Sequence, residues 1–124
     1  MNVLKIKGND SDCEVLLDGE RGIFEFSGRF LPQRTREYFE PILSWIENYS
    51  KKPYSKSTLI FKMDYFNTSS SKKFLDILLI FQSIHSNGFD VEIEWYFHKD
   101  DIDLKDAGLG YSDLVDLPFK YKEY

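Results

Sequence analysis

Residues 58–97, TLIFKMDYFNTSSSKKFLDILLIFQSIHSNGFDVEIEWYF, contain two segments with the pattern of strands on either side of a segment with the pattern of a helix. Thr58–Met63 is mostly apolar, as in a buried strand, and Val91–Phe97 alternates apolar with polar side chains, as in a strand with one wet face. The helical segment ends at Asn87-Gly88, a pair that favours the left-handed C-terminal stop. A crossover of this length predicts parallel pairing of the two strands, and therefore an α/β fold.

Three further strands are predicted near the N-terminus, at Val3–Ile6, Cys13–Leu17 and Ile23–Ser27. The turn-forming sequence DGERG, Asp18–Gly22, joins the second and third of these and predicts an antiparallel hairpin. Together with the two strands above, this pattern predicts a mixed β-sheet of four to five strands with helices packed on it.

Another helix is predicted in LPQRTREYFEPILSWIENYSKK, residues 31–52. Its apolar residues recur every three or four positions and share one face: Tyr38, Phe39, Ile42, Leu43, Ile46 and Tyr49. Because proline removes a backbone donor and collides with the carbonyl four residues earlier, Pro41 predicts a kink or a break into two helical pieces near Tyr38–Glu40. Residues 98–124 predict one or two short helices and a tail closed by Pro118.

Length and composition predict one compact domain, residues 1–124. Hydrophobic residues make up 42% of the chain and aromatic residues 17%, which is enough for a core at this length. The net charge of -5 argues against nucleic-acid binding, which needs a basic face. The longest apolar run, Ile77–Phe81, is too short for a bilayer, and the N-terminal sequence lacks a signal-peptide core. We expect a cytoplasmic protein without membrane insertion, and Cys13, the only cysteine, excludes an internal disulfide.

Motifs for catalysis are missing from the sequence. It has no phosphate-binding loop ending in Gly-Lys-Ser/Thr, no dinucleotide fingerprint and no glycine-flanked serine nucleophile. The two histidines, His85 and His98, lack the spacing of zinc ligands. A calcium site is the alternative raised by an acidic run, Asp100, Asp101, Asp103 and Asp106. The run lacks the glycine and terminal glutamate of the helix-loop-helix site, so a solvated helix start is the preferred interpretation. We expect no enzymatic activity, no cofactor and no metal.

The hydroxyl turn, residues 67–71, joins the strand Thr58–Met63 to the helix that follows, with the sequence Asn67, Thr68, Ser69, Ser70 and Ser71. One interpretation is structural, because Asn, Ser and Thr are the preferred residues for capping orphan amides at a helix start. The other is functional. A phosphorylated hydroxyl at a helix N-terminus faces free amides and the positive end of the dipole, with Lys72 and Lys73 one turn away.

The segment from Leu59 to Trp95 resembles the central strand, turn, helix and strand of STAS domains, the anti-sigma-factor antagonists. In those proteins a hydrophobic strand runs into an Asp-Ser-Ser-Gly turn whose first hydroxyl is phosphorylated by a partner kinase. Aligning Asn67 with the aspartate places Thr68 at that hydroxyl. The resemblance implies a STAS-like domain.

A closer resemblance, covering nearly the whole chain, is to the SiaC family of bacterial regulatory phosphoproteins. The shared landmarks, in order, are IKGNDSDCEVLLD, FSGRFLP, YFEPILSWIENY, FKMDYFNTSSSK and VDLPF. The resemblance implies a protein kinase that phosphorylates the first threonine of the turn, a PP2C-type phosphatase that removes the phosphate, and a diguanylate cyclase activated by the unphosphorylated form. Cyclic di-GMP and biofilm formation would then rise. Carried over to this sequence, the phosphorylated residue is Thr68, in a turn formed with Asn67, Ser69, Ser70, Ser71 and Lys72.

The leading hypothesis is therefore a non-enzymatic protein-protein regulator switched by phosphorylation. A rival hypothesis is an enzyme or small-ligand binder that uses an aromatic surface pocket of Tyr65, Phe66, Trp95 and Tyr96. A third is a purely structural subunit, in which the hydroxyl turn only caps the helix.

Overall fold

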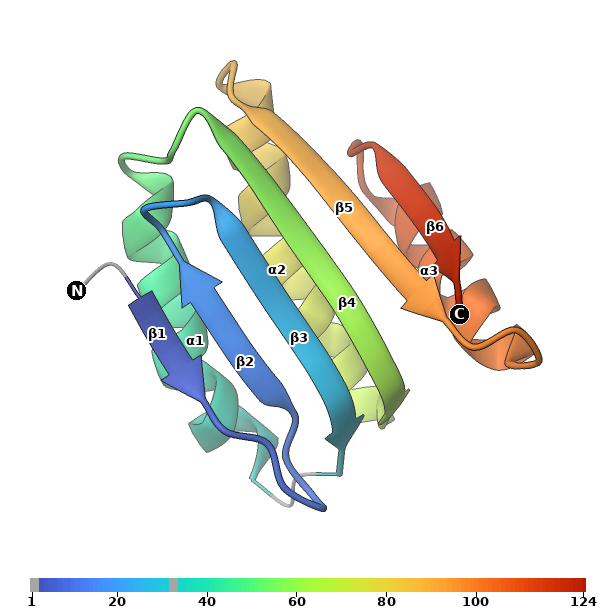
Figure 1. The fold of residues 1–124 in the computed structure, drawn as a ribbon. Coiled ribbons are helices and arrows are strands. Elements are labelled where there is room, and N and C mark those ends of the chain that lie inside the picture. Colours follow the sequence, from blue (N-terminus) through green and yellow to red (C-terminus); the bar gives the residue numbers. More distant parts are fainter. Residues whose placement is uncertain (1–2, 32–33) are drawn as a thin grey trace.

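The computed structural model describes residues 3–31 and 34–124, and Figure 1 shows its fold. The elements in chain order are β1 (Val3–Ile6), β2 (Glu14–Asp18), β3 (Ile23–Phe30), α1 (Thr35–Ser50), β4 (Lys56–Phe66), α2 (Thr68–Ser86), β5 (Asp90–Phe97), α3 (Ile102–Leu114) and β6 (Phe119–Glu123). The strands form one sheet in which spatial order equals chain order. All three helices lie on the same face of this sheet (Figure 1).

The sheet is mixed, as predicted. β1, β2 and β3 pair antiparallel, which confirms the hairpin, whereas β3, β4, β5 and β6 pair in parallel. The predicted parallel pairing of β4 with β5 is confirmed, with Ile60 opposite Glu94. Helix α2 ends as predicted, since Gly88 has a φ of +98°, a left-handed conformation that glycine adopts without strain.

The predicted strand count is wrong, since the described residues form six strands, not four to five, because the tail after Pro118 pairs with β5 as β6. Of the two alternatives predicted at Pro41, a kink or a break, the break is excluded, because helix α1 continues without interruption through Pro41. Proline removes one backbone hydrogen bond, and the buried side chains of Phe39 and Ile42 hold the helix on the sheet at this point. Residues 98–124 contain one helix, α3, before the final strand.

The core lies between the sheet and the helix layer and is largely aromatic. The Phe61 ring packs against Phe74 of α2 at 5.2 Å between centroids and against Trp95 of β5 at the same distance. Trp95 is fully buried, and its indole Nε1 donates a 2.9 Å hydrogen bond to the Leu104 carbonyl of α3. Burying the indole and pairing its one polar atom anchors α3 to the sheet.

The opposite face of the sheet is covered by no described helix (Figure 1). Cross-strand ion pairs run along it, with Lys120 to Glu92 at 3.2 Å and Lys122 to Glu94 at 3.4 Å. This charged face is therefore compatible with exposure to solvent. Within the described residues, no helix combines the length and hydropathy needed to cross a membrane.

The three helices begin at the same edge of the sheet. Each of them follows a parallel strand, so the carboxyl ends of β3, β4 and β5 and the N-termini of α1, α2 and α3 lie together (Figure 1). In α/β sheets, ligands and partners commonly meet this edge. The hydroxyl turn lies there, between β4 and α2.

Candidate functional site

The hydroxyl turn begins with a helix cap. Asn67 is the N-cap of α2, in an extended conformation, and its Oδ1 accepts a 3.0 Å hydrogen bond from the Ser70 amide. The prediction that one residue of the turn satisfies an orphan amide of α2 is thus confirmed, and that residue is Asn67. Thr68 is the first residue inside the helix.

Ser69 and Ser70 are held by side-chain hydrogen bonds. The Ser70 hydroxyl is fully buried and donates to Asn67 Oδ1 at 2.6 Å, and the Ser69 hydroxyl donates to the same oxygen at 3.0 Å. The Ser69 oxygen also lies 2.8 Å from Thr35 Oγ1 at the start of α1. The Ser69 and Ser70 hydroxyls thus do not cap the amides of α2, because Asn67 Oδ1 already accepts from the Ser70 amide.

Ser71 is held by α3. The hydroxyl of Tyr111 donates to the Ser71 carbonyl at 2.8 Å and approaches the Ser71 hydroxyl at 3.0 Å. Burial raises the pKa of Tyr111 to about 12, so the phenol keeps its proton near neutral pH. The turn is therefore tied to α3 as well as to α1.

Thr68 differs from the three serines. Its side chain is exposed, as that of Ser69 is, but unlike the Ser69 hydroxyl the Thr68 hydroxyl has no hydrogen-bond partner within residues 3–31 and 34–124. Lys72 is also exposed and follows Thr68 by four residues, which places both on one face of α2. The hydroxyls of Ser69, Ser70 and Ser71 are thus hydrogen-bonded within the fold. The Thr68 hydroxyl is exposed without a described partner, on the same helix face as Lys72.

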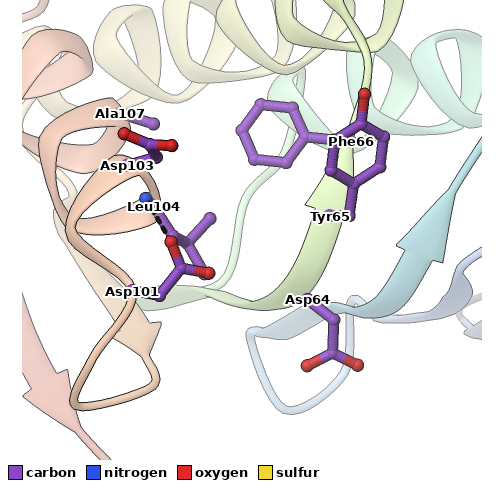
Figure 2. Close-up of a pocket in the computed structure, with 7 residues that line it drawn as sticks. All are labelled: Asp64, Tyr65, Phe66, Asp101, Asp103, Leu104 and Ala107. Atoms are coloured by element: carbon purple, nitrogen blue, oxygen red, sulfur yellow. Dashed lines mark hydrogen bonds between the residues drawn. The ribbon is translucent and has the colours of Figure 1, made fainter.

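An acidic cleft adjoins the turn on the side of α3. Figure 2 shows this cleft, of about 310 Å³, between the end of β4 and the start of α3. It is lined by Asp64, Tyr65, Phe66, Asp101, Asp103, Leu104 and Ala107. Asp101 caps α3 by accepting from the Leu104 amide at 2.9 Å, which confirms the prediction of a helix start in the acidic run. No group of side chains suited to a metal occurs in the described part of the chain.

The aromatic residues of the rival hypothesis do not form one surface. Tyr65 and Phe66 line the acidic cleft. Trp95 is buried in the core, and the Tyr96 ring lies on the opposite face of the sheet, 4.7 Å from Lys62 Nζ. Trp95 and Tyr96 point to opposite faces of β5 and so do not share a pocket. Of the four aromatic residues predicted to form one pocket, only Tyr65 and Phe66 line the same cleft.

Sequence analysis missed Thr35 and Tyr111, which hold the turn in place. They are 34 residues before Ser69 and 40 residues after Ser71. A threonine at a helix start and a tyrosine within a helix carry no local signal for such contacts. Only the packing of α1 and α3 beside α2 brings them to the turn.

The fold and the site define a small α/β protein with an exposed threonine in a hydrogen-bonded turn at the carboxyl edge of its parallel strands. Residues 6–124 match the family described as SiaC family regulatory phosphoprotein, and the chain belongs to that family.

Individual proteins are also similar to this chain in sequence or in fold. An uncharacterized protein of Pseudomonas aeruginosa (strain UCBPP-PA14) is 27% identical over 99 residues, which are 80% of this chain and 79% of that protein. The solved structure of SiaC of Pseudomonas aeruginosa superposes with a TM-score of 0.89 at 24% identity, over 100% of both chains. A chain of the crystal structure of diguanylate cyclase SiaD in complex with its activator SiaC, from the same species, gives 0.92 at 23% identity, over 98% of this chain and 99% of that chain. These structures share the fold.

Proposed function

We propose that this protein is a non-enzymatic, STAS-like regulator, acting as one domain in the cytoplasm, whose binding to a partner is switched by phosphorylation of Thr68. The observation that carries the proposal is the contrast within the hydroxyl turn. Thr68 is exposed and free of described partners, whereas Ser69, Ser70 and Ser71 are engaged with Asn67, Thr35 and Tyr111. Within the turn, Thr68 is therefore the one exposed hydroxyl that a kinase can reach without breaking a described hydrogen bond.

The proposed partner is a diguanylate cyclase, activated by the unphosphorylated form. Membership of the SiaC family supports this proposal, as does the solved complex in which SiaC is described as the activator of the diguanylate cyclase SiaD. A protein kinase and a PP2C-type phosphatase complete the proposed cycle, and both follow from the family resemblance. The output is then a change in cyclic di-GMP and in biofilm formation.

The switch is proposed to act on the surface and not through unfolding. Phosphorylation adds about 1.5 to 2 negative charges at an exposed position beside the positive end of the α2 dipole. The turn itself is fixed on both sides, by Thr35 and by Tyr111. The added phosphate thus changes the charge and shape that a partner meets while the fold is kept.

Calorimetric titration of a diguanylate cyclase from the same organism tests the proposal. Unmodified protein and Thr68→Ala should bind alike, whereas protein phosphorylated at Thr68 should bind at least about a hundredfold more weakly, a difference of roughly 2.7 kcal/mol. Ser86→Ala, an exposed serine at the far end of α2, is the matched control and should remain switchable. Equal affinities for all forms, or phosphopeptides labelled mainly at Ser70 or Ser71, would contradict the proposal.

A further inference from the structure

Arg36 lies on the flank of α1 that faces the hydroxyl turn. The opposite flank is marked by Tyr38, whose hydroxyl donates to the Cys13 carbonyl at 2.9 Å and so faces the β1–β2 connection. Residues of a helix are 100° apart, which places Arg36 about 200° around the axis from Tyr38. Thr35, the residue before Arg36, is in contact with Ser69 at 2.8 Å. Arg36 therefore projects beside the start of α2.

The Arg36 side chain is available for a new contact. It is exposed and has no ion pair with any residue in the two described ranges, 3–31 and 34–124. Its neighbour Arg34, by contrast, is paired with Glu37 at 3.5 Å within the first turn of α1. Of these two arginines, Arg36 is the one without an ion pair to a described residue, although Glu40 follows it by four positions on the same helix face.

The two flanks of the turn differ in charge. On the α3 side lies the acidic cleft with Asp64, Asp101 and Asp103 (Figure 2). The α1 side carries cations as well as carboxylates, since Arg34 is paired with Glu37 and Arg36 lies near Glu40 in the sequence. An anion at Thr68 is repelled by the acidic cleft and attracted by the guanidinium of Arg36, which has no ion pair with a described residue.

We propose that a phosphate on Thr68 is bound within the molecule by the guanidinium of Arg36, with Lys72 as a second cation. This inference rests on the proposed phosphorylation of Thr68. Guanidinium groups bind phosphate through paired hydrogen bonds, and a lysine four residues after an anion on a helix is in the favoured orientation. The contact joins α1 to α2 by charge, next to the neutral contact between Thr35 and Ser69.

The proposed contact also accounts for the direction of the switch. In the unmodified protein Arg36 is free to meet an anionic group on a partner. In the phosphorylated protein the phosphate occupies Arg36, so the partner loses a cation and meets an anion in its place. Phosphorylation thus changes partner binding at this surface by occupying the guanidinium of Arg36.

Phosphorus NMR titration of protein with phosphothreonine placed chemically at position 68 tests the contact. The phosphate of wild type should have a pKa about 0.5 to 1 below that of the same phosphoprotein carrying Arg36→Gln, because a nearby cation favours the dianion. Lys72→Gln should raise the phosphate pKa by less. Arg21→Gln, an exposed arginine in the β2–β3 turn at the other end of the sheet, should leave it unchanged.

An unchanged phosphate pKa in Arg36→Gln would overturn the inference, and so would a rise with Arg34→Gln as large as that with Arg36→Gln. Because the phosphothreonine is installed without a kinase, this result is separate from the proposed function. A kinase that leaves Thr68 unmodified would contradict the proposed function and leave the measured contact standing.

Discussion

The hydroxyl of Tyr111 donates a 2.8 Å hydrogen bond to the carbonyl of Ser71, joining α3 to the first turn of α2. Helix α3 is also joined to the sheet by the hydrogen bond from Trp95 to the Leu104 carbonyl. The site that carries the exposed Thr68 is therefore held by two neighbouring helices, α1 through Thr35 and α3 through Tyr111.

Tyr111→Phe should lower the free energy of unfolding by about 1 to 2 kcal/mol, because it removes a buried donor and leaves the Ser71 oxygens without it. Urea unfolding followed by tryptophan fluorescence measures the change. Tyr121→Phe is the control. The Tyr121 hydroxyl reaches the Gly108 carbonyl only at 3.4 Å, so its removal should cost less than about 0.5 kcal/mol. An equal loss of unfolding free energy in the two variants would contradict a stabilising role for the Tyr111 hydrogen bond.

Asn67→Ala and Thr68→Ala should differ sharply in stability. Asn67 Oδ1 accepts from the Ser70 amide and from the Ser69 and Ser70 hydroxyls, so its loss should cost about 1 to 2 kcal/mol. Thr68 has no described partner, and its replacement should change stability by less than about 0.5 kcal/mol. Thermal unfolding of both variants provides the measurement. A large loss with Thr68→Ala would show that Thr68 serves the helix cap, against the role proposed for it.

Gly108→Ala and Gly110→Ala, two positions of α3, should have effects of opposite sign. A Cβ at Gly108 would lie 2.5 Å from Trp95 Cδ1, and the indole is packed against Phe61, so overpacking should cost about 1 to 3 kcal/mol. A Cβ at Gly110 meets nothing within 4 Å, so the better helix propensity of alanine should stabilise the protein by about 0.5 to 1 kcal/mol. Chemical denaturation compares them, and stabilisation by both alanines would disprove the close packing of α3 on Trp95.

Stability should fall at alkaline pH. Burial raises the pKa of Cys13 to about 11 and that of Tyr111 to about 12, and burial also raises the pKa of Tyr38. Each group holds its proton more tightly in the folded protein, so its contribution is complete below the unfolded pKa and is lost as pH rises through the folded pKa. For Cys13 and Tyr111 this window runs from the ordinary values of 9.0 and 10.0 up to about 11 and about 12.

Urea unfolding at a series of pH values, from about 8 to about 11.5, tests this expectation. The free energy of unfolding of the wild type should decline across the series, and Tyr111→Phe should decline less because one of the three groups is absent. A wild-type stability that stays constant up to the highest pH would contradict the assignment of these buried groups as protonated.

Local patterns were sufficient for the central β4-α2-β5 unit. Apolar runs, alternation and the Asn87-Gly88 stop depend on contacts within a few residues, so the parallel pair and the end of α2 were predictable. Period-two alternation also separates Trp95 from Tyr96, and applying it to the aromatic residues would have excluded their common pocket. Strand β6 was missed because Phe119–Glu123 is short and mostly charged, and its only strand partner among the described residues is β5.

The choice among the four hydroxyls depends on the tertiary structure. Sequence placed them at a helix start, where Asn, Ser and Thr are interchangeable as caps. Thr35 and Tyr111 come from helices 34 and 40 residues away, and they meet Ser69 and Ser71 only because three helices pack side by side on one face of the sheet. That packing engages Ser69 and Ser71, whereas Ser70 is held locally by Asn67 and Thr68 has no described partner. Each hydrogen bond requires a partner at a set distance, which chain order alone does not supply for Ser71.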